Sequence, residues 1–348
     1  YLDGPDSIAA AYREMGERRW LHLPYRALGD LYLSQDRYLD SARSYRAFAQ
    51  RYPDSERAHQ FQMSVIEAYE AGGFGAEVLA EKQRYVQDYS VGSAYWQQGS
   101  PPLRDTLRPQ LKSFTSELAT YYHALAQETG EDAAADVPAE QLYARAGDYY
   151  ALYIDSFPED PEVPAVAYLL GEARHASGEL ELAVQAWEWM AYNNPQHSQA
   201  AEAAYAALLS LEEMQRHSDE PADVRRRRID SGLSFAATFA ADERAPAVLG
   251  YTATELLQLG EYRRAILAAG DLLSWQPAPA EAITTSALLV LGHSRFELRQ
   301  YAEAERAYGR ALAALPAVDD RRSSTVERLA ASIYRQGEAA LAAGDFAA

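Results

Sequence analysis

A pattern of glycine, alanine, tyrosine and proline that returns along the chain is the feature that most limits its fold. The clearest copy runs over residues 25–55, and Asp36 and Arg37 form a polar break near its middle. Small and apolar residues fall at helical spacing on both sides of that break, and Pro53 follows the second run as proline often does beyond a helix end. The copy therefore predicts two helices, marked by Leu28, Gly29 and Tyr32 on the first and by Tyr38, Ser41, Tyr45 and Phe48 on the second.

The sizes of these residues predict how the two helices pack. Gly29 and Ser41 are small, which lets two helices cross closely. Tyr32, Tyr38 and Tyr45 are large and would fill the wider space beside the crossing. Because one helix pair cannot bury its own outer face, we expect successive pairs to stack on one another.

The same order of residues returns further along the chain. Three more good copies are marked by Leu170, Gly171, Gly178, Leu180, Ala183, Trp187, Met190 and Pro195, by Leu256, Gly260, Tyr262, Ala265, Ala269, Leu272 and Pro277, and by Leu291, Gly292, Tyr301, Ala304, Tyr308, Ala311 and Pro316. Weaker copies lie over 61–89, over 143–158 with a first helix expected at 107–126 and a polar loop near 128–138, and over about 200–240. A last copy shows Gly337, Gly344 and Phe346.

These residues resemble the tetratricopeptide repeat family over most of the chain from Tyr25 onward. The resemblance implies an all-α, right-handed superhelical solenoid of antiparallel helix pairs. The copies are spaced by more than the usual length of about 34 residues, as from Pro158 to Pro195 and from Pro277 to Pro316. Long units with a YPDS ending, as at 52–55, look like those of bacterial cell-envelope proteins of the BamD and Tol–Pal coordinator types.

The expected organisation is one solenoid over 1–348. It begins with an N-terminal helix over 1–24 and two repeats over 25–89. An irregular insertion over 90–108, ordered around Tyr95 and Trp96, precedes a long repeat with a polar loop over 109–158. About four and a half further repeats occupy 159–348. Since the last copy stops at Ala348, just after Phe346, we expect the natural protein to continue.

The charge and the cysteine content exclude several classes of partner and site. The net charge is −19, which argues against nucleic acid and anionic membranes as partners, because both attract basic proteins. The chain has no cysteine, so disulfides and thiolate metal sites are excluded. No apolar run approaches the roughly 20 residues of a membrane span. The chain starts without methionine, so a targeting segment could have been removed.

Motifs that would carry catalysis are missing from the sequence. None of the seven histidines forms a metal-binding or catalytic motif. Glycines 72, 73 and 75 lack the lysine of a phosphate-binding loop and predict a turn between helices. The carboxylate pairs Glu212–Glu213 and Asp319–Asp320 are typical of helix ends and loops. We therefore expect no enzymatic activity and no cofactor.

The arginines at 225–228 form a basic run in an acidic chain, and two interpretations of it stay open. The run could dock an acidic partner or a lipid headgroup. It could equally be a solvated helix start that pairs with Asp219, Glu220 and Asp223 upstream.

The family resemblance implies a binding groove on the concave side, lined by the first helix of each pair. The positions expected there mix aromatic and acidic groups, which favours a basic or amine-bearing peptide. A lysine–asparagine clamp for a C-terminal carboxylate is absent, because Arg26 is followed by Asp30. The alternative is that several of these residues pack between repeats. The positions are Arg26, Asp30, Leu33, Glu67, Glu70, Tyr168, Glu172, His175, Leu289, His293, Phe296, Tyr334 and Glu338.

The function expected from these observations is a non-enzymatic scaffold that binds a peptide or helix of a partner protein. The family likeness places it in a bacterial periplasm or at an outer membrane, with the cytoplasm as the open alternative. Two other functions stay open. One is a structural module that self-associates through its C-terminal repeat, and the other is an accessory repeat region of a larger multidomain protein.

Overall fold

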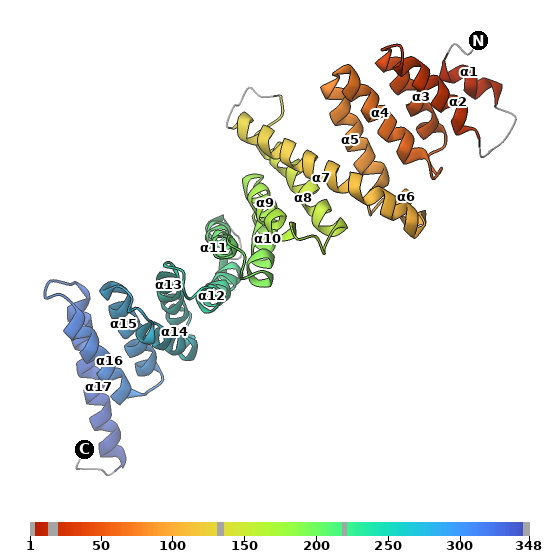
Figure 1. Ribbon diagram of the computed structural model, residues 1–348. Helices are drawn as coiled ribbons and strands as arrows, with labels where there is room; N and C mark the ends of the chain where they lie inside the picture. Colours follow the sequence, from red (N-terminus) through yellow and green to blue (C-terminus); the bar gives the residue numbers. More distant parts are fainter. Residues whose placement is uncertain (1–3, 13–19, 131–135, 218–220, 344–348) are drawn as a thin grey trace. The chain divides into compact units, whose positions relative to one another are not determined.

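The computed structural model describes residues 4–12, 20–130, 136–217 and 221–343, and within them it has seventeen helices and no strand (Figure 1). This confirms the prediction of an all-α array of helix pairs. The chain divides into two compact units, Tyr1–Glu179 and Leu180–Ala348, and each is described by itself.

The first unit contains helices α1 to α9. From α2 onward each long helix packs on the next one, α7 following α5 because α6 is a short helix between them. The helices are α1 (Pro5–Ala11), α2 (His22–Leu33), α3 (Tyr38–Arg51), α4 (Ala58–Gly72), α5 (Gly75–Tyr89), α6 (Ala94–Gln98), α7 (Pro101–Thr129), α8 (Ala139–Ser156) and α9 (Val163–Ala176).

The second unit contains helices α10 to α17, and each of them also packs on the next. The helix α13 contacts α15 as well as its two neighbours in the chain. The helices are α10 (Leu180–Asn193), α11 (Ala200–His217), α12 (Pro221–Thr238), α13 (Ala245–Gln258), α14 (Tyr262–Ser274), α15 (Glu281–Glu297), α16 (Tyr301–Ala314) and α17 (Arg321–Ala343).

Glycine at the helix crossings has the steric role expected from the repeat. A Cβ atom added at Gly29 would lie 2.2 Å from Cε1 of Tyr45, and one at Gly292 would lie 2.7 Å from Cε1 of Tyr308. Both distances are far inside ordinary van der Waals contact. Ser41, the other small residue of the first copy, is buried and donates a hydrogen bond of 2.9 Å to the carbonyl of Gly29. These contacts confirm that small residues let the paired helices approach.

Five of the turns between consecutive helices share one backbone conformation. Glycines 73, 178 and 260 have φ values of 75°, 82° and 75°, in the left-handed region that glycine adopts without strain. Asp36 and Arg299 occupy the same place, two residues before a helix begins, with φ of 59° and 60°. The turn predicted at glycines 72, 73 and 75 is confirmed, because α4 ends at Gly72 and α5 begins at Gly75.

The cores of both units contain aromatic side chains and alanines, and some clusters are dominated by one kind. In the first unit the rings of Phe48 and Phe61 lie 4.2 Å apart between α3 and α4, and those of Tyr85 and Phe114 meet edge to face at 5.3 Å between α5 and α7. In the second unit, alanines 265, 268 and 269 of α14 pack among α13 and α15 with leucines between them. Small side chains let those helices pack closely.

The segment expected to be irregular over 90–108 is helical from Pro101 onward, and this corrects the prediction. Proline is tolerated in the first turn of a helix, where its missing N–H has no partner anyway, so the two prolines at 101 and 102 begin α7. Before it, Ser93 accepts a hydrogen bond from the backbone of Trp96 and starts the short helix α6. Trp96 is buried, so this stretch is ordered as expected.

The expected boundaries at the two chain ends also differ from the structure. The segment 1–24 contains α1 and the start of α2, with 13–19 outside the described residues. The last copy's Gly344 and Phe346 lie outside the described residues too.

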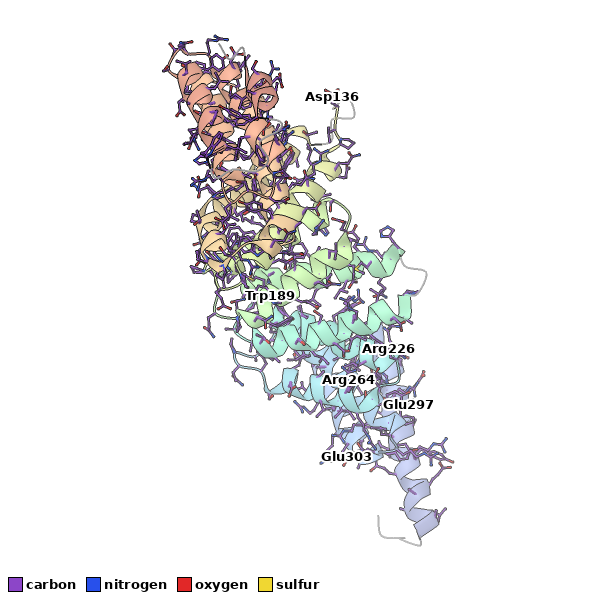
Figure 2. All side chains as sticks on the ribbon, turned by 90° about the vertical axis from the view of Figure 1, so that its right-hand side faces the viewer. Asp136, Trp189, Arg226, Arg264, Glu297 and Glu303 are labelled. Carbon is purple, nitrogen blue, oxygen red and sulfur yellow. The ribbon has the colours of Figure 1, made fainter. Side chains whose placement is uncertain are left out.

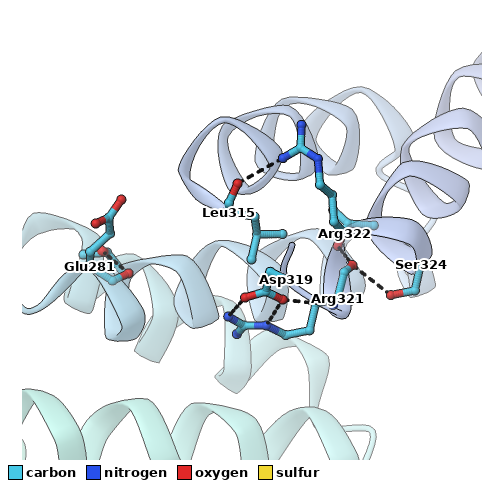
Figure 3. Close-up of polar contacts among 8 residues, drawn as sticks. Glu281, Leu315, Asp319, Arg321, Arg322 and Ser324 are labelled. Atoms are coloured by element: carbon cyan, nitrogen blue, oxygen red, sulfur yellow. Dashed lines mark hydrogen bonds and ion pairs between the residues drawn. The ribbon is translucent and has the colours of Figure 1, made fainter. Parts of the chain in front are cut away.

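At the start of α17, Asp319 accepts hydrogen bonds from the backbone and the guanidinium of Arg321 (Figure 3). Arg322 Nη1 donates to the carbonyl of Leu315 and so satisfies the end of α16 (Figure 3).

Candidate functional site

Two of the expected groove residues, Asp30 and His293, are bonded to the second helix of their own pair. Each follows a crossing glycine. The hydroxyl of Tyr45 donates to Asp30 at 2.5 Å, and the hydroxyl of Tyr308 is hydrogen-bonded to Nδ1 of His293 at 2.9 Å. Burial lowers the pKa of His293 and raises the pKa of Tyr308 to about 12. These polar atoms hold a helix pair together.

Arg26, Leu33 and Phe296 also make contacts inside the repeat stack. Arg26 Nη1 donates to Oγ of Ser64 at 2.8 Å, and its guanidinium lies 4.6 Å from the ring centre of Phe61. Leu33 packs on the aromatic core of the first unit. Phe296 meets Tyr301 edge to face at 5.4 Å. The alternative that such residues pack between helices therefore describes these three well.

The remaining expected groove positions are partly or fully exposed. Glu67, Tyr334 and Glu338 are exposed, and Glu70 lies 3.3 Å from Nζ of Lys82. On α9, burial raises the pKa of Glu172, although a hydrogen bond from Tyr168 acts in the opposite direction. The half-buried group consists of Tyr168, Glu172, His175 and Leu289. All thirteen expected positions together lie on five different helices, and none of them lines any of the cavities described below.

A cavity of about 270 Å³ lies between α11 and α13, with α12 below it. Its walls are mostly apolar. Leu209 and Tyr251 are each 50% exposed, and both line this one cavity. We call this the α11–α13 pocket. It is lined by Tyr205, Leu208, Leu209 and Glu212 from α11, by Arg228 from α12, and by Arg244, Ala247, Val248, Tyr251 and Thr252 from the segment that leads into and forms α13.

Two arginines shape the α11–α13 pocket, and their environments differ. Arg244 lies over the ring of Tyr205 at 4.4 Å and is bonded to Asp242 and Glu202, which raises its pKa. Arg228 is buried, and its guanidinium carbon lies 4.6 Å from the ring centre of Tyr251, whose hydroxyl accepts a hydrogen bond from Nη2. Each guanidinium thus stiffens an aromatic wall of the pocket.

The basic run at 225–228 reaches neighbouring helices, which changes both interpretations of it. Arg225 Nε donates to Glu255 of α13 at 2.5 Å, and Arg227 donates to Glu181 of α10 at 2.6 Å. Of the four arginines, Arg226 (labelled in Figure 2) is exposed and pairs within its own helix, with Asp223 at 3.9 Å. Asp219 and Glu220 lie outside the described residues. Most of the run is therefore used to join helices.

A second cavity, of about 490 Å³, lies in the first unit between α7 and α9. Hydroxyl groups of Ser113, Ser116 and Thr120 line its α7 side, and Val166 and Leu169 line its α9 side. Lys112 at its edge is paired with Asp160. This cavity is wider and more polar than the α11–α13 pocket, and no buried charge faces it without a partner among the described residues.

The histidines and carboxylates of the described residues were the candidates for a metal site. They contain no group of three or more His, Asp or Glu side chains placed to hold a metal ion. Burial lowers the pKa values of His59 and His123, and Nδ1 of each is hydrogen-bonded to a tyrosine hydroxyl, of Tyr95 and Tyr150 respectively. None of the helices in this part of the chain is long and apolar enough to cross a membrane.

Sequence reasoning missed the α11–α13 pocket, because the copy over 200–240 lacks the glycine and tyrosine pattern. A signal was nevertheless present. Tyr205 and Leu209 lie four positions apart on α11, and Val248 and Tyr251 lie three positions apart on α13, so each pair shares one helix face. Both pairs are apolar or aromatic, at positions equivalent to those expected in a groove.

No family model matches this sequence, and no curated protein matches it. Among the solved structures that it resembles are three tetratricopeptide repeat proteins. One, from Parabacteroides merdae ATCC 43184, is 12% identical over 89% of this chain and 98% of that chain, with a TM-score of 0.27. The TPR2AB domain of yeast Sti1 in complex with pHSP90 is 13% identical over 90% and 96%, with a TM-score of 0.30. The TPR domain of P58(IPK) is 12% identical over 91% and 98%, with a TM-score of 0.30.

Proposed function

We propose that the chain is a non-enzymatic scaffold that binds a peptide or helical segment of a partner protein. The α11–α13 pocket, with its half-exposed Leu209 and Tyr251, is the observation that carries this proposal. Its volume of about 270 Å³ lies near the lower end of the roughly 300–1,000 Å³ typical of small-molecule sites, and it leaves room for an apolar side chain of a partner. Aromatic walls are typical of the pockets that anchor protein partners.

Rigidity supports the same function. The ring of Tyr251 is fixed by Arg228, and the ring of Tyr205 is covered by Arg244. A pocket whose walls are already ordered loses less side-chain entropy when a partner binds. The pocket is therefore prepared to receive an apolar side chain without rearrangement.

The test is a selection of peptides from a displayed random library on the immobilised chain. Peptides that bind the pocket should lose binding to a Leu209→Glu variant, because a charge would stand on the pocket wall. The matched control is Leu267→Glu, which puts the same charge on a leucine of α14 that is 68% exposed. A library that yields no peptide sensitive to Leu209→Glu would refute the proposal.

We propose a bacterial cell envelope as the setting. The support is the long repeat spacing and the YPDS ending at 52–55, which resemble envelope proteins of this type. Fractionation of cells that make the complete protein would test this. Recovery in the cytoplasmic fraction alone would contradict it.

Self-association is the second candidate, and it is favoured by one face of α17. Val326, Ile333 and Leu341 share this face and are 49%, 51% and 66% exposed. Two copies of α17 could pack antiparallel about a two-fold axis between Ile333 and Tyr334. Val326 of one copy would then contact Leu341 of the other, and the helix face that runs from Val326 to Leu341 carries no charged residue. Light scattering that finds a concentration-dependent dimer, lost in Ile333→Glu, would support this. A monomer at every concentration would exclude it.

A further inference from the structure

A third cavity, of about 400 Å³, lies at the C-terminal ends of α3 and α5 in the first unit. Its walls come mainly from these two helices, which are the second helices of their pairs, and from the start of α6. First helices, which would line a groove, contribute only Gln62 of α4. We call this the α3–α5 pocket. Its polar lining includes Asp54, Gln62, Arg84, Asp88, Tyr89 and Tyr95.

Two carboxylates in this lining have no counter-ion. Asp54 and Asp88 are exposed, and neither forms an ion pair among the described residues. Arg84 is the one cation in the lining, and its guanidinium lies 3.9 Å from Glu81, a carboxylate that is also bonded to Arg46. Burial raises the pKa of Asp88, and the nearby Arg84 offsets this only in part. The lining therefore carries a net negative charge that its surroundings balance poorly.

Two nearly buried side chains present further acceptors to the pocket. Tyr89 is 4% exposed, its ring packs against Tyr85 and Tyr95, and its hydroxyl takes part in no hydrogen bond found among the described residues. Gln62 is 2% exposed, and because a carboxylate only accepts, its amide nitrogen must face Glu81, which leaves Oε1 without a donor. Neither oxygen is among the fully enclosed atoms that lack a partner, so both open on the cavity that these residues line.

Unused acceptors and a net negative charge favour a ligand that only donates. A lysine ammonium carries three N–H donors and an arginine guanidinium carries five, and neither has an acceptor. Their hydrogen bonds to a carboxylate are roughly twice as strong as those between neutral groups. The rings of Tyr89 and Tyr95, which meet edge to face at 4.8 Å, add an aromatic surface that attracts a cation.

We propose that the α3–α5 pocket binds one lysine or arginine side chain of a partner protein. Asp54 and Asp88 balance the charge of this side chain, and the oxygens of Tyr89 and Gln62 accept its remaining N–H groups. The net charge of −19 adds a long-range attraction for a basic partner. The site lies in the first unit and goes beyond the function proposed for the α11–α13 pocket, which lies in the second unit.

The experiment selects peptides from a displayed random library on the whole immobilised chain and measures their binding to variants. Peptides that enter the pocket should bind Asp88→Asn about tenfold more weakly, as expected for the loss of a charged hydrogen bond. The matched control is Asp155→Asn, because Asp155 is also exposed and lies next to the last residue of a second helix, α8. It removes the same charge from the chain, and binding should not change.

A second variant tests the unpaired hydroxyl. Tyr89→Phe keeps the packed ring and removes an oxygen that no other described residue contacts by a hydrogen bond, so the fold should be retained. It should weaken the same peptides several-fold. The control is Tyr121→Phe, where the side chain is 44% exposed and lies outside the pocket, and binding should again stay the same.

The charge of the ligand is tested on the wild-type protein, which avoids any folding defect of a variant. Replacing a lysine of a selected peptide by norleucine, or an arginine by citrulline, nearly keeps the size of the side chain and removes its charge. Binding should fall at least tenfold in one of these two arms. The arm in which it falls identifies the cation that enters the pocket.

The inference is overturned if no selected peptide distinguishes Asp88→Asn from Asp155→Asn. It is also overturned if the peptides that do so contain no lysine or arginine, or keep their affinity after the neutral replacements. The proposed function is unaffected by these outcomes, because it is tested separately at Leu209.

Discussion

Replacing Gly292 by alanine should destabilise the second unit, although alanine is the better helix former. An alanine inside a helix normally gains about 1 kcal/mol over glycine. At this site the new Cβ would lie 2.7 Å from Cε1 of Tyr308, about 1 Å inside ordinary contact. The ring cannot easily move, because Tyr308 is fully buried and its hydroxyl is bonded to His293. Overpacking of this kind costs about 1–3 kcal/mol and outweighs the helical gain.

The assay is urea unfolding followed by circular dichroism, with Gly309→Ala as the matched control. Gly309 lies inside α16, and no heavy atom lies within 4 Å of a Cβ built there. We expect Gly309→Ala to raise the unfolding midpoint and Gly292→Ala to lower it. Shortening the partner, as in Tyr308→Leu, should turn the effect of Gly292→Ala from unfavourable to neutral or favourable. Equal midpoints for the two alanine variants would refute the steric argument.

Three further outcomes follow from other contacts. Arg299→Gly should raise the free energy of unfolding by up to about 1 kcal/mol, because Arg299 has a φ of 60°, and Gly260→Ala should lower it by a similar amount in the same urea assay; the reverse order would contradict this. Glu81→Ala should cost about 3 kcal/mol by leaving Arg46 unpaired, whereas Glu67→Ala on the exposed side of α4 should change stability by less than about 0.5 kcal/mol. Burial raises the pKa of several tyrosines, so the folded chain holds phenol protons that the unfolded chain releases. The contribution of these tyrosines to the free energy of unfolding should therefore be fully present below pH 10 and be lost as the pH rises to about 12. Absorbance of phenolate during a pH titration measures this, and complete ionisation near pH 10 without unfolding would contradict it. The tyrosines with a pKa of about 12 are Tyr45, Tyr150, Tyr192 and Tyr308.

The helix pairs could be predicted from the sequence because each pair depends on residues close together in the chain. Gly29 and Tyr45 belong to one repeat copy, and their contact follows from helical spacing and size alone. The helical start at Pro101 was missed because proline usually interrupts a helix. In the first turn of a helix proline is favoured instead, and the two prolines here occupy that turn.

The apolar wall of the α11–α13 pocket had a signal in the sequence, but the surroundings of its buried arginine could not be predicted, because they depend on contacts between helices. The burial of Arg228 follows from its position under Tyr251, and its charge balance depends on how Glu255 is shared with Arg225. None of these distances is visible in a run of four arginines. The same limit applies to Asp30 in the first unit, where a tyrosine hydroxyl from the next helix determines what the carboxylate does.

The arginine run on α12 forms two ion pairs to neighbouring helices that differ in their exposure to solvent. Arg225 joins α12 to α13 through Glu255, whose side chain is 9% exposed, whereas Arg227 joins α12 to α10 through Glu181, in a pair in which both partners are more than 40% exposed. Dissolved ions weaken the second kind of bond and hardly reach the first. A higher ionic strength should therefore weaken the ion pair between α10 and α12, and equally the exposed pair of Arg264 with Asp230 between α14 and α12, while the buried pair beside the α11–α13 pocket is retained.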